Sequence, residues 1–225
     1  AVGLALTATS ALAQEGGPAQ PDVTVIGQRP PTAASSTKFT APLIDTPKSV
    51  TVISQARIAE TGSTSLVDAL RTVPGITFNA GEGGQPAGDN LKIRGFDAGA
   101  DVFIDGIRDA GSQMRDVFAL EQIEVVKGPG SAYSGRGSSG GSVNLVSKRP
   151  RDDAFVSTNL GAGTDSYGRV AVDANYRFGD SGGFRLNLLR QDTGGAGRTT
   201  LAASHAGIAP SPPFGLGRPP PGRLG

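Results

Sequence analysis

The sequence predicts an α+β domain followed by the first antiparallel strands of a transmembrane β-barrel, with the barrel incomplete. Short β-branched runs and short helical patterns alternate over residues 42–150, and an apolar–polar alternation follows over residues 167–178. Glycine contributes 34 and proline 16 of the 225 residues, while aromatic residues make up only 5%. This composition favours many short strands joined by long loops over a helical bundle.

Residues 42–150 carry the pattern of the α+β domain. A helix is expected at residues 54–60, and Ser65 begins a capping box for a second helix, which Pro74 and Gly75 end. The expected strands are 48–53, 76–78, 91–93, 102–104, 123–127 and 142–147, with glycine-rich loops at 80–89 and 128–141. This mixture of helices and strands predicts a small mixed domain.

Residues 151–192 have the character of barrel strands. From Gly168 to Phe178 the even-numbered residues form an apolar face, and the odd-numbered residues form a largely polar one. Residues 184–188 continue this alternation after a turn, and residues 154–162 form a weaker strand of the same kind. Two-faced strands of about ten residues with tight turns are typical of a membrane barrel wall. A soluble antiparallel sheet with one wet face is the alternative.

The N-terminal residues predict export and a flexible arm. Residues 1–13 read as the end of a secretory signal peptide, because an apolar run closes in Ala11-Leu12-Ala13; a short buried helix is the alternative. Residues 14–41 are expected to be a linker. Within this linker one run is β-prone, so it is either a local extended stretch or a strand that adds to the sheet of another protein. The run is Asp22, Val23, Thr24, Val25 and Ile26.

Residues 193–225 are predicted to be an irregular tail. Six prolines and four glycines fall within residues 210–225. Proline is excluded from helix interiors and from most strand positions. An aberrant or frame-shifted stretch of coding sequence is one interpretation of this tail.

Charge and residue content exclude several kinds of chemistry. The 21 basic and 20 acidic residues give a net charge of +1, without the basic stripe that nucleic-acid binding needs. The absence of cysteine and the single histidine, His205, exclude thiolate and multi-histidine metal sites. Residues 135–140 spell G-x-G-x-x-G, but residues 142–146 read as a strand where a dinucleotide site needs a helix. No catalytic constellation is found, so the chain is not expected to be an enzyme.

Six short segments between residues 42 and 192 form a recognisable series along the chain. They are PKSVTVI (47–53), LVDAL with VPGI (66–76), IRGF (93–96), VFIDGIRD (102–109), LEQIEV (120–125) and KGP to GGSVNLVSK (127–148). Each segment alone is weak, but together they closely resemble the plug and first barrel strands of TonB-dependent siderophore receptors. The catecholate type is the most similar branch.

The resemblance implies a transporter of the bacterial outer membrane that imports ferric siderophores. Residues 42–150 take the place of the plug that gates the barrel lumen. Residues 22–26 take the place of the TonB box, which pairs in the periplasm with TonB, the partner of ExbB and ExbD. The plug and arm would face the periplasm, and the barrel would contact outer-membrane lipid. Plugged barrels have about 22 strands, and iron stays chelated by the siderophore, so no cofactor is expected.

The resemblance also supplies candidate site residues. The apex loops of the family correspond to residues 80–89, 97–101 and 108–116. Ferric catecholates are anionic, so Arg108, Gln113 and Arg115 are the predicted siderophore contacts. Arg94 and Lys127 match basic residues that pair in the family with carboxylates of the barrel wall, as a plug–barrel latch.

Two other functions stay open at this stage. Because only about three wall strands are expected, the chain could be a periplasmic, plug-like binding module without a barrel. The G-x-G-x-x-G segment leaves a nucleotide-dependent enzyme as a third hypothesis. Two or three strands also leave open edges that lipid cannot satisfy, so the chain alone is not expected to insert as a barrel.

Overall fold

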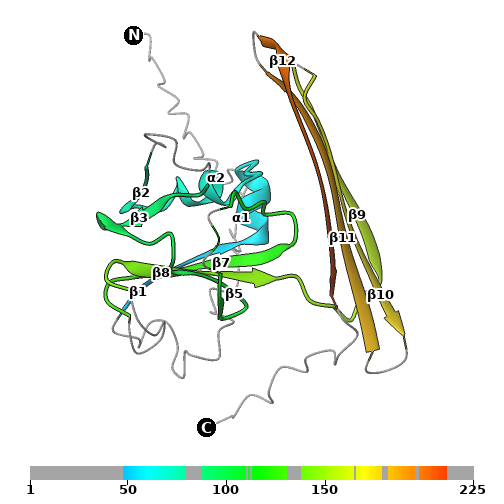
Figure 1. Cartoon of the computed structure of the whole chain (residues 1–225). Coiled ribbons are helices and arrows are strands. Elements are labelled where there is room, and N and C mark those ends of the chain that lie inside the picture. Colours follow the sequence, from blue (N-terminus) through cyan, green and yellow to red (C-terminus); the bar gives the residue numbers. More distant parts are fainter. Residues whose placement is uncertain are drawn as a thin grey trace, which may run out of the picture. The chain divides into compact units, whose positions relative to one another are not determined.

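The computed structural model describes residues 48–79, 88–109, 111, 113–130, 138–164, 166–178, 182–195 and 198–211. All of these belong to the second of two compact units, residues 31–225. They form an α+β domain and a separate four-stranded antiparallel sheet (Figure 1). This arrangement confirms the predicted fold class. The predicted signal-peptide remnant and the arm with residues 22–26 lie outside the described residues.

The α+β domain is built on a five-stranded mixed sheet with the order β1-β7-β8-β5-β6. Only β5 and β8 run parallel, and all other neighbours are antiparallel. A hairpin joins β5 and β6, because Asp105 and Gly106 adopt φ angles of 49° and 85°, as a tight two-residue turn requires. The strands are β1 (Ser49–Ser54), β5 (Val102–Ile104), β6 (Ile107–Arg108), β7 (Leu120–Lys127) and β8 (Gly141–Ser147).

Two short helices and a second sheet complete the domain. Helix α1 (Gln55–Glu60) is capped by Ser54, whose side chain accepts a hydrogen bond from the Arg57 amide. Helix α2 (Leu66–Leu70) has the predicted capping box, formed by Ser65 and Asp68. The second sheet has the order β2-β3-β4, with β2 (Ile76–Phe78), β3 (Leu91–Ile93) and β4 (Phe96–Asp97). Neither of these helices, nor any other in the described part, is long and apolar enough to cross a membrane.

One apolar core joins the helices to both sheets of the domain. At the centre of this core, apolar side chains from α2, β3, β7 and β8 are completely buried, and their burial stabilises the domain. The central residues are Leu66, Leu70, Ile93, Ile123, Val125 and Val143.

Glycines allow close backbone contact where the chain enters β8. A Cβ atom on Gly140 would lie 2.3 Å from the Ile93 carbonyl oxygen, and one on Gly141 would lie 2.2 Å from that of Val126. The G-x-G-x-x-G segment ends at Gly140, and the element that follows it is strand β8. A dinucleotide site needs a helix at this point, so the segment lacks that frame.

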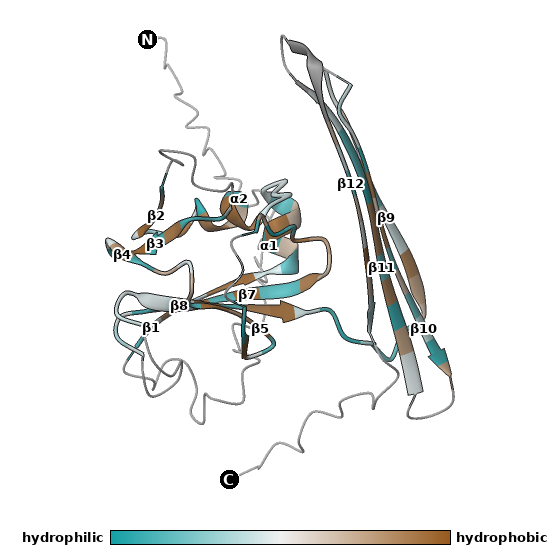
Figure 2. Ribbon diagram, viewed as in Figure 1, coloured by the Kyte–Doolittle hydropathy of each residue, from teal (hydrophilic) through white to brown (hydrophobic). Residues whose placement is uncertain are grey.

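Strands β9 (Phe155–Ala162), β10 (Gly168–Phe178), β11 (Gly182–Gly195) and β12 (Arg198–Ser211) form the four-stranded sheet, in that order. Its two faces differ as the alternation predicted, and Figure 2 shows apolar and polar residues following one another along β10 and β11. Large apolar residues are exposed on one face and polar residues are buried on the other. The exposed set includes Val156, Leu160, Val170, Tyr176, Leu188 and Ile208, and the buried set Arg169, Asp173, Asn175, Arg185 and Asn187.

The prediction that an irregular tail begins at residue 193 is wrong as far as residue 211. Strand β11 continues to Gly195, and β12 pairs with it up to Ser211, with Leu186 opposite Pro210. Among the described strands β12 has a single neighbour, and an edge strand tolerates proline because one side needs no N–H donor. Proline content alone therefore gave the wrong result, and residues 212–225 lie outside the described part.

Candidate functional site

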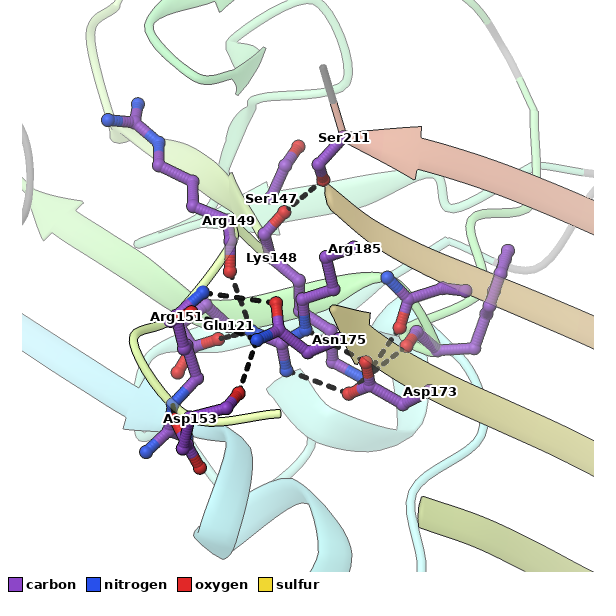
Figure 3. Close-up of polar contacts among 12 residues, drawn as sticks. Glu121, Ser147, Lys148, Arg149, Arg151, Asp153, Asp173, Asn175, Arg185 and Ser211 are labelled. Atoms are coloured by element: carbon purple, nitrogen blue, oxygen red, sulfur yellow. Dashed lines mark hydrogen bonds and ion pairs between the residues drawn. The ribbon is translucent and has the colours of Figure 1, made fainter. Parts of the chain in front are cut away.

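The first candidate site is a charged cluster of the buried Lys148, Asp173 and Arg185 with the partly exposed Glu121, called the junction cluster below (Figure 3). Asp173 on β10 accepts two hydrogen bonds from Arg185 on β11, from Nε at 2.8 Å and from Nη2 at 2.7 Å. Lys148 Nζ lies 2.9 Å from Asp173 Oδ2, and Arg185 Nη1 lies 3.1 Å from Glu121 Oε2. These ion pairs bind the α+β domain to the four-stranded sheet.

Burial makes the junction cluster sensitive to the loss of any one charge. The side chains of Arg185, Lys148 and Asp173 are 1%, 7% and 11% exposed. Burial lowers the pKa of Lys148 below its usual 10.5, and the hydrogen bond with Asp173 offsets part of this shift. Removing one partner of such a pair leaves an uncompensated buried charge, at a cost of about 3–5 kcal/mol.

Further contacts hold the connector, residues 148–153, against the same sheet. Asn175 on β10 accepts a hydrogen bond from the Arg151 amide and donates one to the Arg151 carbonyl oxygen, both at 3.0 Å. Lys148 Nζ also donates to Asn187 Oδ1 on β11 at 3.2 Å. The Ser211 hydroxyl on β12 donates to the Lys148 carbonyl oxygen. Strands β10, β11 and β12 therefore all contact the connector.

A second attachment lies at Asp116, before strand β7. Both carboxylate oxygens of Asp116 accept hydrogen bonds at 2.8 Å from Arg169 on β10. Arg169 also donates to the Gln191 side chain on β11. Sequence reasoning missed both attachments. The available signal was the presence of charged residues at polar-face positions of an alternating strand, such as Arg169 and Asp173.

Two of the predicted ligand contacts, Gln113 and Arg115, belong to a third cluster. Arg115 Nη1 lies 2.7 Å from Asp89 Oδ2, and Nη2 lies 2.9 Å from Asp109 Oδ2. Gln113 is exposed and donates to Asp109 Oδ2 at 3.1 Å. Burial raises the pKa of Asp89 above 3.8, although Arg115 opposes the rise. Desolvation also acts to raise the pKa of Asp109, but hydrogen bonds from Arg115 and Gly111 outweigh it and lower this pKa below 3.8.

The third predicted contact, Arg108, lies apart from that cluster. Its Nη1 is 2.8 Å from Asp101 Oδ1, and its guanidinium carbon lies 5.0 Å from the centre of the Phe103 ring. The Arg108 side chain is 32% exposed. The Arg108 side chain is therefore more exposed than that of the buried Arg115.

The predicted latch residues, Arg94 and Lys127, lie close to each other. Burial lowers the pKa of Lys127 below 10.5, and the nearby charge of Arg94 lowers it further. Arg94 is exposed and has a φ angle of 53°, which L residues rarely adopt. Between described residues, no ion pair with a carboxylate is found for either side chain, so the described part leaves two neighbouring cations without a counter-charge.

The remaining site predictions concern the N-terminal arm and metal binding. The predicted TonB box, residues 22–26, lies outside the described residues. Within the described ranges, no group of three or more His, Asp or Glu residues is arranged to hold a metal ion.

One protein-family model matches the α+β domain. Residues 42–142 match the family model of the TonB-dependent receptor plug domain. The chain belongs to the TonB-dependent receptor family. It is 45% identical over 221 residues to the probable TonB-dependent siderophore receptor PiuA of Acinetobacter baumannii, covering 96% of the chain and 30% of that protein. It is 42% identical over 189 residues to the catecholate siderophore receptor Fiu of Escherichia coli K12, covering 83% of the chain and 25% of Fiu.

Solved structures of both receptors share the fold. The crystal structure of PiuA gives a TM-score of 0.74 at 48% identity, over 79% of this chain and 25% of that one. The closed form of the ferric-catecholate import receptor Fiu gives 0.78 at 42% identity, over 83% of this chain and 27% of that one. The α+β domain is therefore the plug, and β9–β12 are strands of a barrel wall that is incomplete here. The chain spans less than a third of these relatives.

The alignment also bears on the tail of the receptor chain. It covers 96% of the chain, so it extends into residues 193–225. Strand β12 (Arg198–Ser211) lies in the first part of this tail.

Proposed function

We propose that this chain forms the plug and the first wall strands of an outer-membrane transporter that imports ferric siderophores, with the plug gating the barrel lumen. PiuA and Fiu are siderophore receptors by name, and Fiu is a catecholate receptor, which supports this class of cargo. Iron travels as the siderophore chelate, so the transporter performs no chemistry on it and acts as a receptor rather than an enzyme.

The two-faced sheet β9–β12 is the observation that carries this proposal. Its apolar face is exposed, and it includes the aromatic residues Tyr176, Phe178 and Phe184. Its polar face is ion-paired to the plug through Arg169, Asp173 and Arg185. These faces suit lipid on the outside and a plug-filled lumen on the inside. A periplasmic module without a barrel would leave the apolar face in water, which disfavours that alternative.

In this proposal the N-terminal arm binds the partner that supplies the energy for import. TonB, working with ExbB and ExbD, binds residues 22–26 by strand addition on the periplasmic side. The sequence DVTVI supports this because four consecutive β-branched residues favour an extended strand, and strand addition uses main-chain hydrogen bonds for affinity and alternate side chains for specificity. Import is then driven by force on the arm and not by a reaction within the plug.

The opposite end of the plug supplies the ligand site. We place the ferric siderophore at the loops that carry Arg108, Gln113 and Arg115, because the guanidinium of Arg108 and the amide of Gln113 suit an anionic ferric catecholate. The Arg108 side chain is 32% exposed and Gln113 is exposed, so both residues are accessible to a ligand. Arg94 and Lys127 act as the latch in this proposal, and they pair with carboxylates of barrel-wall strands beyond those described.

Binding and uptake measurements test the proposal in two steps. The complete protein is expressed in a bacterial host without ferric-catecholate receptors of its own, and labelled iron is supplied with 2,3-dihydroxybenzoic acid. We expect both binding and uptake. Val25→Pro should keep binding but abolish uptake, because proline removes an N–H donor from the added strand. Ala34→Pro in the same linker is the control, and absence of binding by the unaltered protein would refute the proposed function.

A further inference from the structure

We infer that Arg115 is a positioning residue, which holds Asp109, Gly111 and Gln113 in their ligand-binding positions without contacting the siderophore. The identity of the ligand rests on the proposed function, whereas the positioning role rests on the geometry of Arg115 itself. The Arg115 side chain is only 7% exposed, although it belongs to a loop region with exposed neighbours such as Gln113 and Met114.

Every N–H group of the Arg115 guanidinium has a partner within the plug. Nε donates to Asp109 Oδ2 at 3.0 Å. Nη1 donates to Asp89 Oδ2 at 2.7 Å and to the Gln113 carbonyl oxygen at 3.3 Å. Nη2 donates to Asp109 Oδ2 at 2.9 Å and to the Gly111 carbonyl oxygen at 2.8 Å. A guanidinium carries five N–H donors, so this arrangement leaves none for a ligand.

The backbone of Arg115 is fixed as well as its tip. Its carbonyl oxygen accepts a hydrogen bond at 2.8 Å from the amide of Leu66, the first residue of α2. The next residue, Asp116, is ion-paired to Arg169 of the barrel wall. The backbone of Arg115 is therefore held against α2 and, through Asp116, against the wall. The guanidinium can then fix the position of the residues it contacts relative to both.

The charges around Arg115 argue against direct anion binding. Two carboxylates, Asp89 and Asp109, flank one guanidinium, so the cluster as a whole does not attract an anion. The hydrogen bonds of Arg115 instead fix the backbone at or next to the two proposed ligand-binding residues, Gln113 and Arg108. Gln113 is held through its carbonyl oxygen, and Asp109 directly follows Arg108 in the chain. Arg115 thus sets the positions from which Arg108 and Gln113 can meet the ligand.

Two substitutions in the complete receptor separate positioning from contact, with the ferric complex of 2,3-dihydroxybenzoic acid as the probe. Asp109→Asn removes a negative charge, so electrostatics alone would tighten binding of this anionic complex. A positioning role for Arg115 predicts the opposite. The Asp109→Asn and Arg115→Lys receptors should each bind the ferric complex about tenfold more weakly, because each substitution breaks part of a buried cluster. Arg57→Lys, in an exposed ion pair with Glu60, is the control and should bind normally. Unchanged or tighter binding by Asp109→Asn would overturn the inference.

Amide hydrogen exchange tests the same inference without any ligand. In Arg115→Lys and Asp109→Asn, exchange at Gly111 and Gln113 should be about tenfold faster or more, while β7 amides keep their rates. Unchanged exchange in this loop would contradict positioning, whatever the receptor binds. If Arg115→Lys does not fold, Asp109→Asn carries the test, because its side chain is partly exposed. If exchange is faster in the variants but the unaltered receptor binds no ferric catecholate, the proposed function is refuted and the positioning role of Arg115 stands.

Discussion

Replacing Asp173 by asparagine should release the plug connector from the barrel wall. Asp173 balances two buried cations, Lys148 and Arg185, and asparagine keeps the size of the side chain but removes its charge. Among the described residues, only Glu121, whose side chain is 40% exposed, would remain as an ion-pair partner. Breaking a buried pair from one side costs about 3–5 kcal/mol. At about 1.4 kcal/mol per decade, local opening should become roughly 10² to several 10³ times more frequent.

Amide hydrogen exchange in the complete receptor measures this opening. The reporters are the Lys148 amide, which donates to the Ala119 carbonyl oxygen at 2.9 Å, and the Arg151 amide, which donates to Asn175. Both should exchange faster in Asp173→Asn by the factor above, and adding Lys148→Met should restore part of the protection, because it removes one unbalanced cation.

The matched control is Asp192→Asn. Asp192 forms a bidentate ion pair with Arg190 at 2.8 and 3.1 Å, but its side chain is 51% exposed. Exposed pairs contribute little because water and salt screen them, so the reporters should keep their rates. Equal exchange in Asp173→Asn and Asp192→Asn would refute the claim that the junction cluster holds the connector.

Three further results are expected. Gly141→Ala should destabilise the plug by about 3 kcal/mol in chemical unfolding, because the φ angle is 143° and the new Cβ would lie 2.2 Å from a carbonyl oxygen; Gly168→Ala, with open space around it, should not. The lowered pKa of Asp109 means that its ion pair with Arg115 stabilises the plug above pH 3.8 and is lost as pH falls through that lowered pKa. The protection factor of the Gly111 amide, which donates to Asp109, should follow this acid transition, and an Asp109→Asn variant that kept it would contradict the assignment. The 225-residue chain expressed alone should show no heat-modifiable migration in detergent, because β9 and β12 leave open edges; a heat-modifiable band would prove that reasoning wrong.

Local patterns were sufficient to predict most of the fold. The capping box at Ser65 depends on residues three positions apart, and strands β2, β3 and β5 have the predicted bounds. The alternation from Gly168 to Phe178 fixed which residues share a face. Strands β4 and β6 have two residues each, too few for any periodicity, so they could not be found. Strand β12 was missed because the prolines from Pro210 onward, five of which follow the strand, outweighed its pairing, which is a property of the sheet.

The candidate site was harder to predict because its partners are far apart in sequence. Arg185 and Glu121 are 64 positions apart, and no local pattern indicates that they meet. Arg115 was selected as a basic residue in a loop of the expected apex. Its burial depends on Asp89, which lies 26 positions away but only 2.7 Å from it in space. The sequence therefore placed Arg115 in a loop but could not show that its side chain is buried.

The attachments of the plug bear on the gating by TonB that the proposed function includes. In the described part, three ion pairs join the plug to the wall, and they begin at Asp116, Glu121 and Lys148, all after β6 in the chain. Strand β1, which follows the N-terminal arm, is instead an edge strand paired only with β7. If TonB pulls on the arm, the force reaches this edge first. Detaching β1 breaks one antiparallel ladder and leaves β7, β8, β5 and β6 held by the junction cluster, so the plug can open in part while its later strands stay bound to the barrel.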